Sequence, residues 1–568
     1  MTDLKTIYAI VALSALAAGC SDGTTPESAD ATGEDAGLAP DIVEALQSAA
    51  RGEPFHDDVH PDTARTGRAM SPIQAAFDVR HYGLSLKVMP DTRTIDGTLD
   101  VTFTANDTLE AIELDLDPRL DVKDARLGDQ SLAVTRNEDR FTVALPEAMA
   151  AGSRATVSID YGGKPHVAKA PPWHGGFVWS EIDDTPWFAT AVQTEGCDLW
   201  WPCKDTFADK PDEGVRVSIS APKGVTVASV GVLESVEDRG DGYETWNWVS
   251  HHPYAGYAIA INGGPYQLIE REYTGVNGTT YPIRFWALPK NVDKAAALIE
   301  SDAIPHLKFF ERMIGPYPWG DEKVGFVETP HLGMEHQTIN GYGEQYKRGT
   351  YGFDGLLHHE LAHEWFGNVM THARPQDSWL HEGYGAYMQH VYAEETVGRM
   401  GYLDGMFRAY VDTEHCDPAA NPAVVDVGEA FDNRDIYTKG AWMLHTLRNY
   451  IGEDAFWAGT RRLIFDTAEP WSLHYPVQSR YRTTEEFTRI MSEEAGEDVA
   501  WLVDTYMYEA GMPELEEARE DGRLTLSWTV PGGRSFPMPV EVAVNGEISV
   551  VEISNDSGSI EVPTRRAS

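Results

Sequence analysis

The sequence predicts a multidomain α+β protein with an N-terminal antiparallel β domain, a mostly helical middle domain and a small C-terminal β-sandwich. Three observations lead to this fold class. Hydrophobic residues alternate with polar ones from about residue 73 to 265, then recur at helical spacing, and alternate again from about residue 512. The chain has 568 residues, of which 42% are hydrophobic, and that is enough to build several buried cores.

The N-terminal segment has the pattern of a targeting signal. Lys5 precedes an apolar run at residues 7–18, which is too short to span a bilayer but suits the core of a signal peptide. The run leads into LAAGC at residues 16–20, which resembles a bacterial lipoprotein box. We therefore expect residues 1–20 to be a lipoprotein signal peptide whose Cys20 is lipidated, with an ordinary cleaved signal as the alternative.

This signal predicts where the protein resides. We expect a lipid-anchored protein of the bacterial cell envelope that faces the periplasm or the outer membrane, or else a secreted protein. Residues 21–72 are rich in Ala, Asp, Glu, Gly, Pro and Thr and poor in large apolar residues, so they predict a flexible linker. Beyond residue 20 no apolar run approaches the length of a membrane span, so membrane contact is expected only through the lipid.

The charge balance excludes one class of partner. Lys and Arg total 45 against 90 Asp and Glu, which gives a formal net charge of −45. Binding to a phosphate backbone needs clustered cations, so we expect no nucleic-acid partner. An acidic surface also favours cationic ligands, such as peptides that begin with Lys or Arg.

The first predicted domain covers residues 73–265. Tyr82, Leu84, Leu86 and Val88 alternate with polar residues, and further short runs of this kind are separated by Gly, Asp and Pro, as in antiparallel sheets. Within it lie two cysteines, at 197 and 203. Outside the cytoplasm these two could form a disulfide, and unpaired structural thiols are the alternative.

The second predicted domain covers residues 266–511 and the third covers residues 512–568. Helical spacing in the second predicts helices at residues 295–313, 354–369, 383–396, 439–451 and 484–495. In the third, Leu524, Leu526 and Trp528 alternate with polar residues, which predicts the strands of a small sandwich.

The strongest chemical signal is His359-Glu360-Leu361-Ala362-His363, an HExxH pattern. Residues four apart share one face of a helix, so the imidazoles of His359 and His363 can bind one zinc ion. Glu360 lies beside them and can act on a metal-bound water. Glu382 follows His363 near the start of the next predicted helix and can supply a third ligand, since His₂Glu sets occur in zinc hydrolases that keep the fourth position for water.

These motifs resemble those of the gluzincin aminopeptidases of family M1, whose pattern is HExxH, 18 residues and then Glu. The resemblance extends over HELAHEWFGN at residues 359–368 and runs from about residue 79 to 513, with the motifs in the family's order. It implies that the middle domain is a thermolysin-like, mostly α catalytic domain that binds one zinc ion per chain through His359, His363 and Glu382.

The resemblance also implies a substrate-binding set. Gly333, Met334 and Glu335 match the family's GxMEN motif, whose glutamate binds the free α-amine of the substrate. Gln193-Thr194-Glu195 resembles a segment that adds a Gln or Glu to this amine site, and we assign Glu195 to that role. Tyr437 matches the tyrosine that hydrogen-bonds the developing oxyanion.

Two residues depart from the family pattern. His336 replaces the Asn of GxMEN, and His381 replaces the Asn of WLNEG. Neither change removes a predicted metal ligand or the predicted base. A change at His336 bears on substrate alignment, whereas His381 is expected to hydrogen-bond behind the ligands.

Together these residues predict a zinc-dependent aminopeptidase that hydrolyses the first peptide bond of peptides with a free N-terminus. Glu360 acts as general base on a metal-activated water, and Tyr437 stabilises the oxyanion. Because few residues follow the catalytic region, we expect an open site that accepts longer peptides. The preferred first residue and the oligomeric state are left open by the sequence.

Three alternatives remain at this point. A thermolysin-type endopeptidase shares HExxH and a downstream glutamate, but the motif at residues 333–335 disfavours it. A non-catalytic binding lipoprotein on a peptidase fold would usually have lost a ligand or the base. Epoxide hydrolysis occurs within the same family, and nothing in the sequence specifically supports it.

Overall fold

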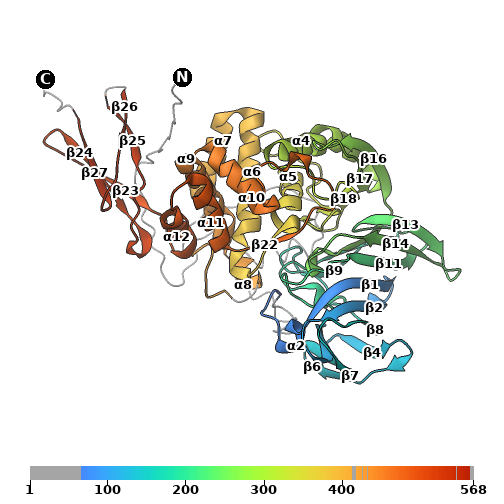
Figure 1. Cartoon of the computed structure of the whole chain (residues 1–568). Helices are drawn as coiled ribbons and strands as arrows, with labels where there is room; N and C mark the ends of the chain where they lie inside the picture. Colours follow the sequence, from blue (N-terminus) through green and yellow to red (C-terminus); the bar gives the residue numbers. More distant parts are fainter. Residues whose placement is uncertain (1–65, 412–416, 425–426, 432, 545–546, 563–568) are drawn as a thin grey trace.

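The computed structural model describes residues 66–411, 417–424, 427–431, 433–544 and 547–562. The expected signal peptide with Cys20, and the expected linker up to residue 65, lie outside these residues. Figure 1 shows a β-sheet domain first, a helical region in the middle and C-terminal sheets at the far end. The predicted multidomain α+β class is confirmed in these terms.

An eight-stranded sheet is the largest element of the N-terminal domain. Its strand order is β13-β14-β11-β1-β2-β8-β4-β5. The bounds are Phe77–Met89 (β1), Thr94–Ala105 (β2), Leu120–Leu127 (β4), Gln130–Ser131 (β5), Arg154–Gly163 (β8), Val215–Pro222 (β11), Val232–Asp238 (β13) and Tyr243–Ser250 (β14).

Two smaller sheets complete this domain. One pairs β12 (Thr226–Ser229), β15 (Ile261–Gly264), β10 (Thr185–Ala191) and β9 (Gly176–Ile182) in that order. The other pairs β3 (Leu109–Asp115), β7 (Arg140–Met149) and β6 (Val134–Asn137). The alternating residues of β1, including Tyr82 and Leu84, are buried in one hydrophobic core beneath the sheets.

The alternating pattern predicts an antiparallel sheet, but the sheet in the structure is mixed. β1 pairs with β2 antiparallel on one side but with β11 parallel on the other, from Tyr82 opposite Val215 to Lys87 opposite Ser220. Antiparallel neighbours can be joined by a short hairpin, whereas a parallel pair needs a long crossover. Here residues 90–214 form that crossover, and alternation within a strand carries no information about it.

A five-stranded sheet opens the second region and borders the site described below. Its order is β16-β17-β18-β20-β19, with bounds Gln267–Thr274, Thr280–Ala287, Val324–Glu328, Asn340–Tyr342 and Gly333–Met334. β19 is therefore an edge strand. The short parallel pair β21 (Met370–His372) and β22 (Arg480–Arg482) lies elsewhere in this region.

Helices make up most of the rest of the middle region. They are α3 (Val292–Leu298), α4 (Ile304–Met313), α5 (Gly355–Ala362), α6 (Trp379–Val397), α7 (Arg399–Val411), α8 (Val427–Phe431), α9 (Thr438–Ile451), α10 (Glu453–Phe465), α11 (Thr484–Ala495) and α12 (Ala500–Tyr508). One further four-residue helix, α2 (Pro72–Ala75), precedes β1. The helix expected at residues 354–369 ends early, because the backbone leaves helical geometry at Phe366 (φ −101°, ψ 69°).

The C-terminal part consists of two small sheets. They are β23-β24-β27 (Glu514–Glu520, Arg523–Thr529, Ser557–Glu561) and β25-β26 (Val540–Val544, Glu547–Val551). Leu524, Leu526, Val540, Val551 and Ile553 form their shared core. The sheets contact the helical region through Phe536, whose ring meets Trp501 of α12 edge-on at 5.1 Å.

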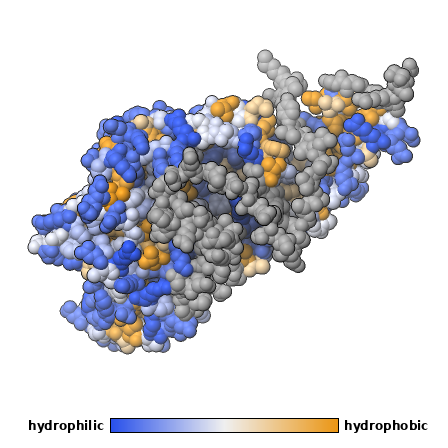
Figure 2. Space-filling model, turned by 180° about the vertical axis from the view of Figure 1, so that it is seen from behind, coloured by the Kyte–Doolittle hydropathy of each residue, from blue (hydrophilic) through white to orange (hydrophobic). Residues whose placement is uncertain are grey.

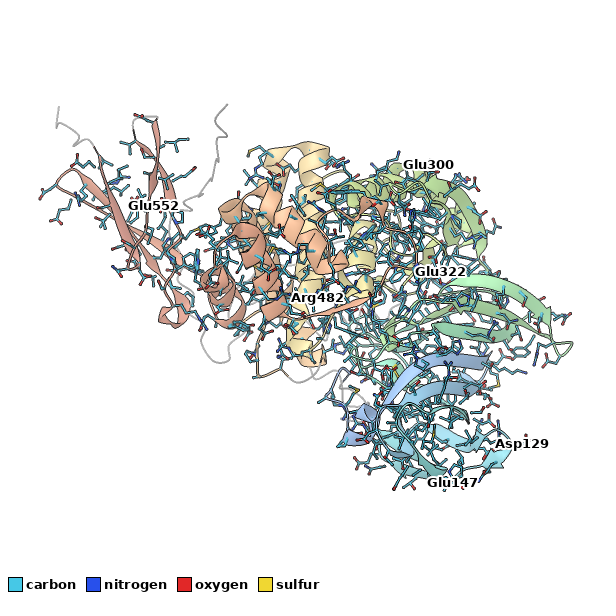
Figure 3. All side chains as sticks on the ribbon, in the orientation of Figure 1. Asp129, Glu147, Glu300, Glu322, Arg482 and Glu552 are labelled. Atoms are coloured by element: carbon cyan, nitrogen blue, oxygen red, sulfur yellow. A yellow bond between two sulfur atoms is a disulfide. The ribbon has the colours of Figure 1, made fainter. Side chains whose placement is uncertain are left out.

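The surface reflects the excess of acidic residues. Figure 2 shows a mostly hydrophilic face on which hydrophobic residues lie in separate patches. In Figure 3, Asp129, Glu147, Glu300 and Glu552 mark exposed acids that are spread over all three parts of the molecule. Among the described residues, no helix has the length and apolar character needed to cross a membrane.

Candidate active site and metal centre

Three side chains converge as a ligand set. His359 Nε2 lies 3.2 Å and His363 Nε2 lies 3.5 Å from Glu382 Oε2, and the two imidazole Nε2 atoms are 3.1 Å apart. Ligands about 2.0–2.1 Å from a tetrahedral zinc ion lie about 3.3–3.4 Å from one another. The observed separations, and the mix of imidazole and carboxylate donors, therefore fit a zinc ion.

Helix α5 places the two histidines. Asp354 caps its N-terminus by accepting a hydrogen bond from the backbone N–H of Leu357 at 2.9 Å. His359 lies in the last turn and His363 is the C-terminal cap, so both imidazoles point to the same face. His363 Nδ1 lies 2.9 Å from the carbonyl oxygen of Phe366 and can donate to it, which leaves Nε2 as the nitrogen that would ligate a metal.

Helix α6 brings the third ligand and packs closely against the first two. Glu382 lies in its first turn, one turn before Gly385. A Cβ on Gly385 would lie 2.8 Å from Cε1 of His359 and 3.2 Å from Cε1 of His363. Glycine at this position therefore lets α6 lie against both imidazoles, and the Gly385 backbone hydrogen-bonds His359.

Charge holds Glu382 as an anion. Burial acts to raise the pKa of this carboxyl, but His363 and His359 outweigh burial and keep the pKa below its usual value. For His363, burial acts to lower the pKa, but Glu382 raises it to about 10. A carboxylate between two imidazoles is thus stable as an anion, which is the form that ligates a metal.

The three ligands line a cavity of about 510 Å³. This volume lies within the range of small-molecule sites. The cavity is lined by Pro172, Trp173, Gln193, Leu332, Gly333, Met334, Glu335, Leu356, His359, Glu360, His363, Glu382, Phe431, Arg434, Tyr437 and Thr438. The N-terminal domain, the five-stranded sheet and the helices all contribute to it.

Glu360, the predicted base, lies in this cavity beneath the edge strand. Burial, with the nearby charge of Glu335, raises its pKa well above the usual value. A Cβ on Gly333 would lie 2.6 Å from Glu360 Oε1. Glycine at the start of β19 therefore leaves the space that this carboxylate occupies.

Glu335 lies at the end of the cavity that the N-terminal domain closes. Its Oε1 accepts hydrogen bonds from Gln193 Nε2 at 2.5 Å and from the Tyr257 hydroxyl at 3.2 Å. Gln193 Nε2 also lies 3.4 Å from Glu382 Oε1. Burial raises the pKa of Glu335 to about 7, so a bound cation would favour its anionic form.

Glu195 does not reach the cavity, although the sequence assigned it to the amine site. Its side chain is 1% exposed, and Oε2 accepts hydrogen bonds from the Gly175 N–H and the Thr194 hydroxyl, both at 2.8 Å. Burial raises its pKa to about 7. Gln193, two residues earlier, occupies the expected place, since side chains within this short segment point in different directions.

Tyr437 lines the same cavity as the base, and it lies immediately after the 3₁₀ turn Arg434–Ile436 and before α9. Its hydroxyl hydrogen-bonds Glu382, and its pKa is raised well above the usual value, by burial first and then by Glu382 and Glu335. The hydroxyl thus keeps its proton and can donate it. Its ring lies 6.3 Å from that of His359.

The two departures from the family pattern lie behind the cavity. His336 is fully buried, and its ring meets that of His331 at 6.5 Å rather than facing the cavity. His381 Nε2 accepts a hydrogen bond from the backbone N–H of His372 at 2.9 Å. This contact supports the predicted role of His381 as a hydrogen-bonding residue behind the ligands.

Several residues of the cavity were not predicted from the sequence. Trp173 comes from the loop before β9, and Phe431 and Arg434 come from the segment before Tyr437. None belongs to a motif of recognisable spacing. The one feature of the sequence that could have indicated a cavity position was that Arg434 lies only three residues before Tyr437.

Cys197 and Cys203 form a disulfide close to Gln193. The alternative of two unpaired thiols is therefore excluded for this pair. The bridge closes a loop over residues 197–203 that contains the short turn Cys197–Leu199, and a closed loop of this size limits the freedom of the residues within it.

Comparison with known proteins finds a family model that matches part of the helical region. Residues 347–506 match the model described as "Peptidase family M1 domain". Human endoplasmic reticulum aminopeptidase 1 is 24% identical over 410 residues, which cover 67% of this chain and 42% of that protein. Leukotriene A-4 hydrolase of Xenopus laevis is 23% identical over 409 residues, covering 67% of this chain and 64% of that protein. The chain thus spans less than two thirds of these relatives.

Two solved structures share the fold. A mutant M1 zinc metallopeptidase of Deinococcus radiodurans, bound to a Tyr-Ser-Ala substrate, gives a TM-score of 0.65 at 22% identity and covers 81% of this chain and 99% of that one. Aminopeptidase A of Legionella pneumophila, in complex with aspartic acid, gives 0.69 at 16% identity and covers 88% of this chain and 59% of that one.

Proposed function

We propose, from the match of residues 347–506 to the peptidase family M1 domain, that this chain is a zinc-dependent aminopeptidase acting on peptides with a free N-terminus. The observation that carries the proposal is the convergence of His359, His363 and Glu382 with Glu360 and Glu335 in one cavity. Relatives named as aminopeptidases support the same activity.

The amine end of the cavity accounts for cleavage at the first residue. Glu335 presents a buried carboxylate held by Gln193 and Tyr257, and no cation among the described residues pairs with it. A buried carboxylate without a positive partner is costly, and a substrate ammonium would supply that partner. We therefore assign Gln193, rather than Glu195, as the second residue of the amine site.

The chemistry divides among the remaining residues. His359, His363 and Glu382 would hold a zinc ion, which would act as a Lewis acid and lower the pKa of a bound water. Glu360 accepts the proton from the attacking water and passes it to the leaving amine. Tyr437 donates its hydroxyl proton in a hydrogen bond to the oxygen of the scissile carbonyl as negative charge develops there, a contribution of about 3–4 kcal/mol for donors of this kind.

Edge strand β19 offers a way to orient the peptide. Gly333 and Met334 pair with β20 on one side only, and both residues line the cavity. An extended peptide can add to such an edge through main-chain hydrogen bonds. The substrate would then lie along β19 with its amine at Glu335 and its first carbonyl near Glu360.

The test is an assay of the purified protein on aminoacyl anilides, each with a free or an acetylated amine and each with or without chelator. We expect release from the free amines alone, and its loss with chelator. Equal cleavage of acetylated peptides would support an endopeptidase. A protein that holds zinc and binds peptides without turnover would support a non-catalytic binding protein.

Metal content tests the ligand set directly. We expect about one zinc ion per chain in the wild type, and loss of zinc in His359→Ala and His363→Ala. His474→Ala, on an exposed loop away from the cavity, is the matched control and should keep its zinc. Full zinc content in the two ligand variants would contradict the assignment.

We also propose that Cys20 is lipidated and anchors the protein in the bacterial cell envelope. Only the sequence at residues 16–20 supports this. Expression of the full chain in a bacterium should give a detergent-soluble protein whose N-terminal peptide begins at a lipid-modified Cys20. Cys20→Ser should be soluble without detergent, and a wild type with the same behaviour would contradict the anchor.

A further inference from the structure

One charged residue of the cavity has no role in the proposed reaction. Arg434 lines the cavity, and it lies in the turn directly before Tyr437. It is the single lysine or arginine among the sixteen lining residues, against three carboxylates. Its side chain is exposed, so it stands at the open part of the cavity rather than in the core.

The Arg434 guanidinium is unengaged in the described structure. Neither an ion pair nor a side-chain hydrogen bond joins it to any described residue. Most arginines elsewhere differ: Arg374 pairs with Asp377 at 2.7 Å, and Arg482 bonds the carbonyl of Leu463 at 2.8 Å. Only the backbone of Arg434 is fixed, through its carbonyl oxygen, which accepts from the Thr438 hydroxyl at 3.2 Å.

Arg434 does not serve to neutralise the acidic residues of the cavity. Glu382 is occupied by two imidazoles, Glu335 by Gln193 and Tyr257, and Glu360 lies beneath Gly333. None of the three carboxylates lies within ion-pair distance of Arg434. Because the guanidinium of Arg434 pairs with none of these three carboxylates, it is available to bind an anionic group that enters the cavity from outside.

The position relative to the reaction centre indicates which part of a substrate it meets. Glu335 and Gln193 lie at the amine end, whereas Arg434 precedes Tyr437, the residue at the scissile carbonyl. A group beyond that carbonyl belongs to the leaving part of the peptide. Each extended residue spans about 3.3–3.6 Å. A cavity of this size therefore has room for a short peptide with one or two residues after the scissile bond.

We propose that Arg434 binds a carboxylate on the leaving-group side of the peptide substrate, and so determines specificity. This inference rests on the proposed aminopeptidase function. Two sources share that chemistry: the C-terminal carboxylate of a di- or tripeptide, and the acidic side chain of the second or third residue of a longer one. A planar guanidinium can bind either through two parallel hydrogen bonds.

The wild-type enzyme provides the first test. Ala-Ala-Ala and its C-terminal amide differ in one carboxylate, and Ala-Glu-Ala amide restores a carboxylate as a side chain. Alanine anilide carries none and reports the proposed function alone. We expect at least one carboxylate-bearing peptide to exceed Ala-Ala-Ala amide about tenfold in kcat/KM, mainly through KM.

The outcomes separate the sources and the two proposals. Preference for Ala-Ala-Ala identifies the C-terminal carboxylate, and preference for Ala-Glu-Ala amide identifies the side chain. Equal rates on all three peptides, with the anilide hydrolysed, would overturn the role of Arg434 and leave the proposed function intact. No hydrolysis of the anilide or the peptides by zinc-loaded protein would overturn the function itself.

Variants then locate the preference. In Arg434→Gln the ratio of kcat/KM between the favoured peptide and the amide should fall toward one, and Arg434→Lys should restore part of it. Using a ratio within each variant removes effects of folding and of zinc content. Arg489→Gln, on the exposed face of α11, is the matched control and should keep the wild-type ratio. An unchanged ratio in Arg434→Gln would overturn the assignment.

Discussion

At the scale of single residues, the cavity depends on small side chains as much as on charged ones. Gly333 and Gly385 leave space for Glu360 and for the two imidazoles. Neither glycine has a positive φ, so what each position requires is the absence of a Cβ, not an unusual backbone conformation. A side chain at position 333 would displace the predicted base Glu360, and one at position 385 would displace the imidazoles of His359 and His363.

Gly333→Ala should lower kcat strongly while leaving the protein folded. The new methyl carbon would lie 2.6 Å from Glu360 Oε1 and 2.8 Å from Leu356 Cδ1, so the carboxylate must move. Displacement of a general base by about 1 Å can cost on the order of a hundredfold in rate. Steady-state kinetics on an alanine anilide measure the effect.

The control for that variant is Gly349→Ala. A Cβ there would meet only the carbonyl oxygen of Phe353, at 3.7 Å, which is ordinary contact. Its kcat should equal that of the wild type. Equal kcat in Gly333→Ala would show that Glu360 is either not crowded or not the base.

At the scale of elements, the cap of α5 sets the position of the HExxH helix. Asp354 accepts from the Leu357 N–H at 2.9 Å and from the Tyr342 hydroxyl at 2.5 Å. It thereby joins the helix to strand β20 of the five-stranded sheet. Burial raises the pKa of the Asp354 carboxyl to about 6 in spite of these hydrogen bonds.

The raised pKa predicts a pH dependence of stability. An unfolded Asp has a pKa of about 3.9, so between about pH 4 and 6 the folded state holds the proton more tightly. The contribution of Asp354 to the free energy of unfolding therefore falls as pH rises through this window, by at most about 3 kcal/mol, and is constant above about pH 7.

Asp354→Asn isolates this contribution, because asparagine caps helices comparably and does not titrate. The melting temperature of the wild type should fall relative to that of the variant between pH 4 and 6. Asp129→Asn, on an exposed turn, is the control for effects unrelated to the cap. A constant difference between wild type and Asp354→Asn across this window would contradict the shift.

At the crossing of α6 and α9, Glu382 lies on α6 and Tyr437 is the N-terminal cap of α9. Gly383 and Gly440 meet there, and a Cβ on Gly440 would lie 3.0 Å from the Cα of Gly383. Because Glu382 precedes Gly383, any separation of the helices moves a metal ligand. The close crossing thus connects helix packing with metal binding.

Gly440→Ala should destabilise the protein and weaken zinc binding about tenfold or more. Overpacking costs about 1–3 kcal/mol, of which the higher helix propensity of alanine offsets about 1 kcal/mol. Gly355→Ala, where a Cβ would have only a 3.4 Å contact, should not weaken zinc binding. Competition with a chelator of known affinity measures the zinc affinity of the wild type and of both variants. Equal zinc affinities in the wild type and Gly440→Ala would contradict the coupling between helix packing and metal binding.

Several elements could be predicted and others could not. The helix at 484–495 was predicted with its observed bounds, since its apolar stripe and cap are local. Helices α7, α10 and α12 were missed; the first and last have weakly amphipathic sequences. The distortion after Ala362 was also missed, because it depends on the contacts of Phe366 and Gly367 rather than on residue spacing.

At the scale of the whole molecule, the net charge of −45 should attract cationic substrates over long distances. We expect kcat/KM for an arginine anilide to fall more steeply than that for an alanine anilide between low and high NaCl, because screening shortens the range of the field. Parallel slopes would show that the surface charge does not steer substrates. Potassium chloride serves as the control for an effect specific to sodium.

The sequence by itself determined the ligand set and the order of the domains. HExxH lies within one helix, so the geometry of His359, Glu360 and His363 follows from a period of 3.6 residues. Alternation and helical spacing are likewise local properties, and they sufficed for the β, helical and β regions.

Tertiary structure alone decided which residues face the cavity. Gln193 rather than Glu195 reaches Glu335, Arg434 and Trp173 line the cavity, and β11 joins β1 in parallel. Each depends on how segments far apart in the sequence pack together. Local periodicity carries the direction of a side chain relative to its own helix or strand, but not the neighbour that this side chain will meet.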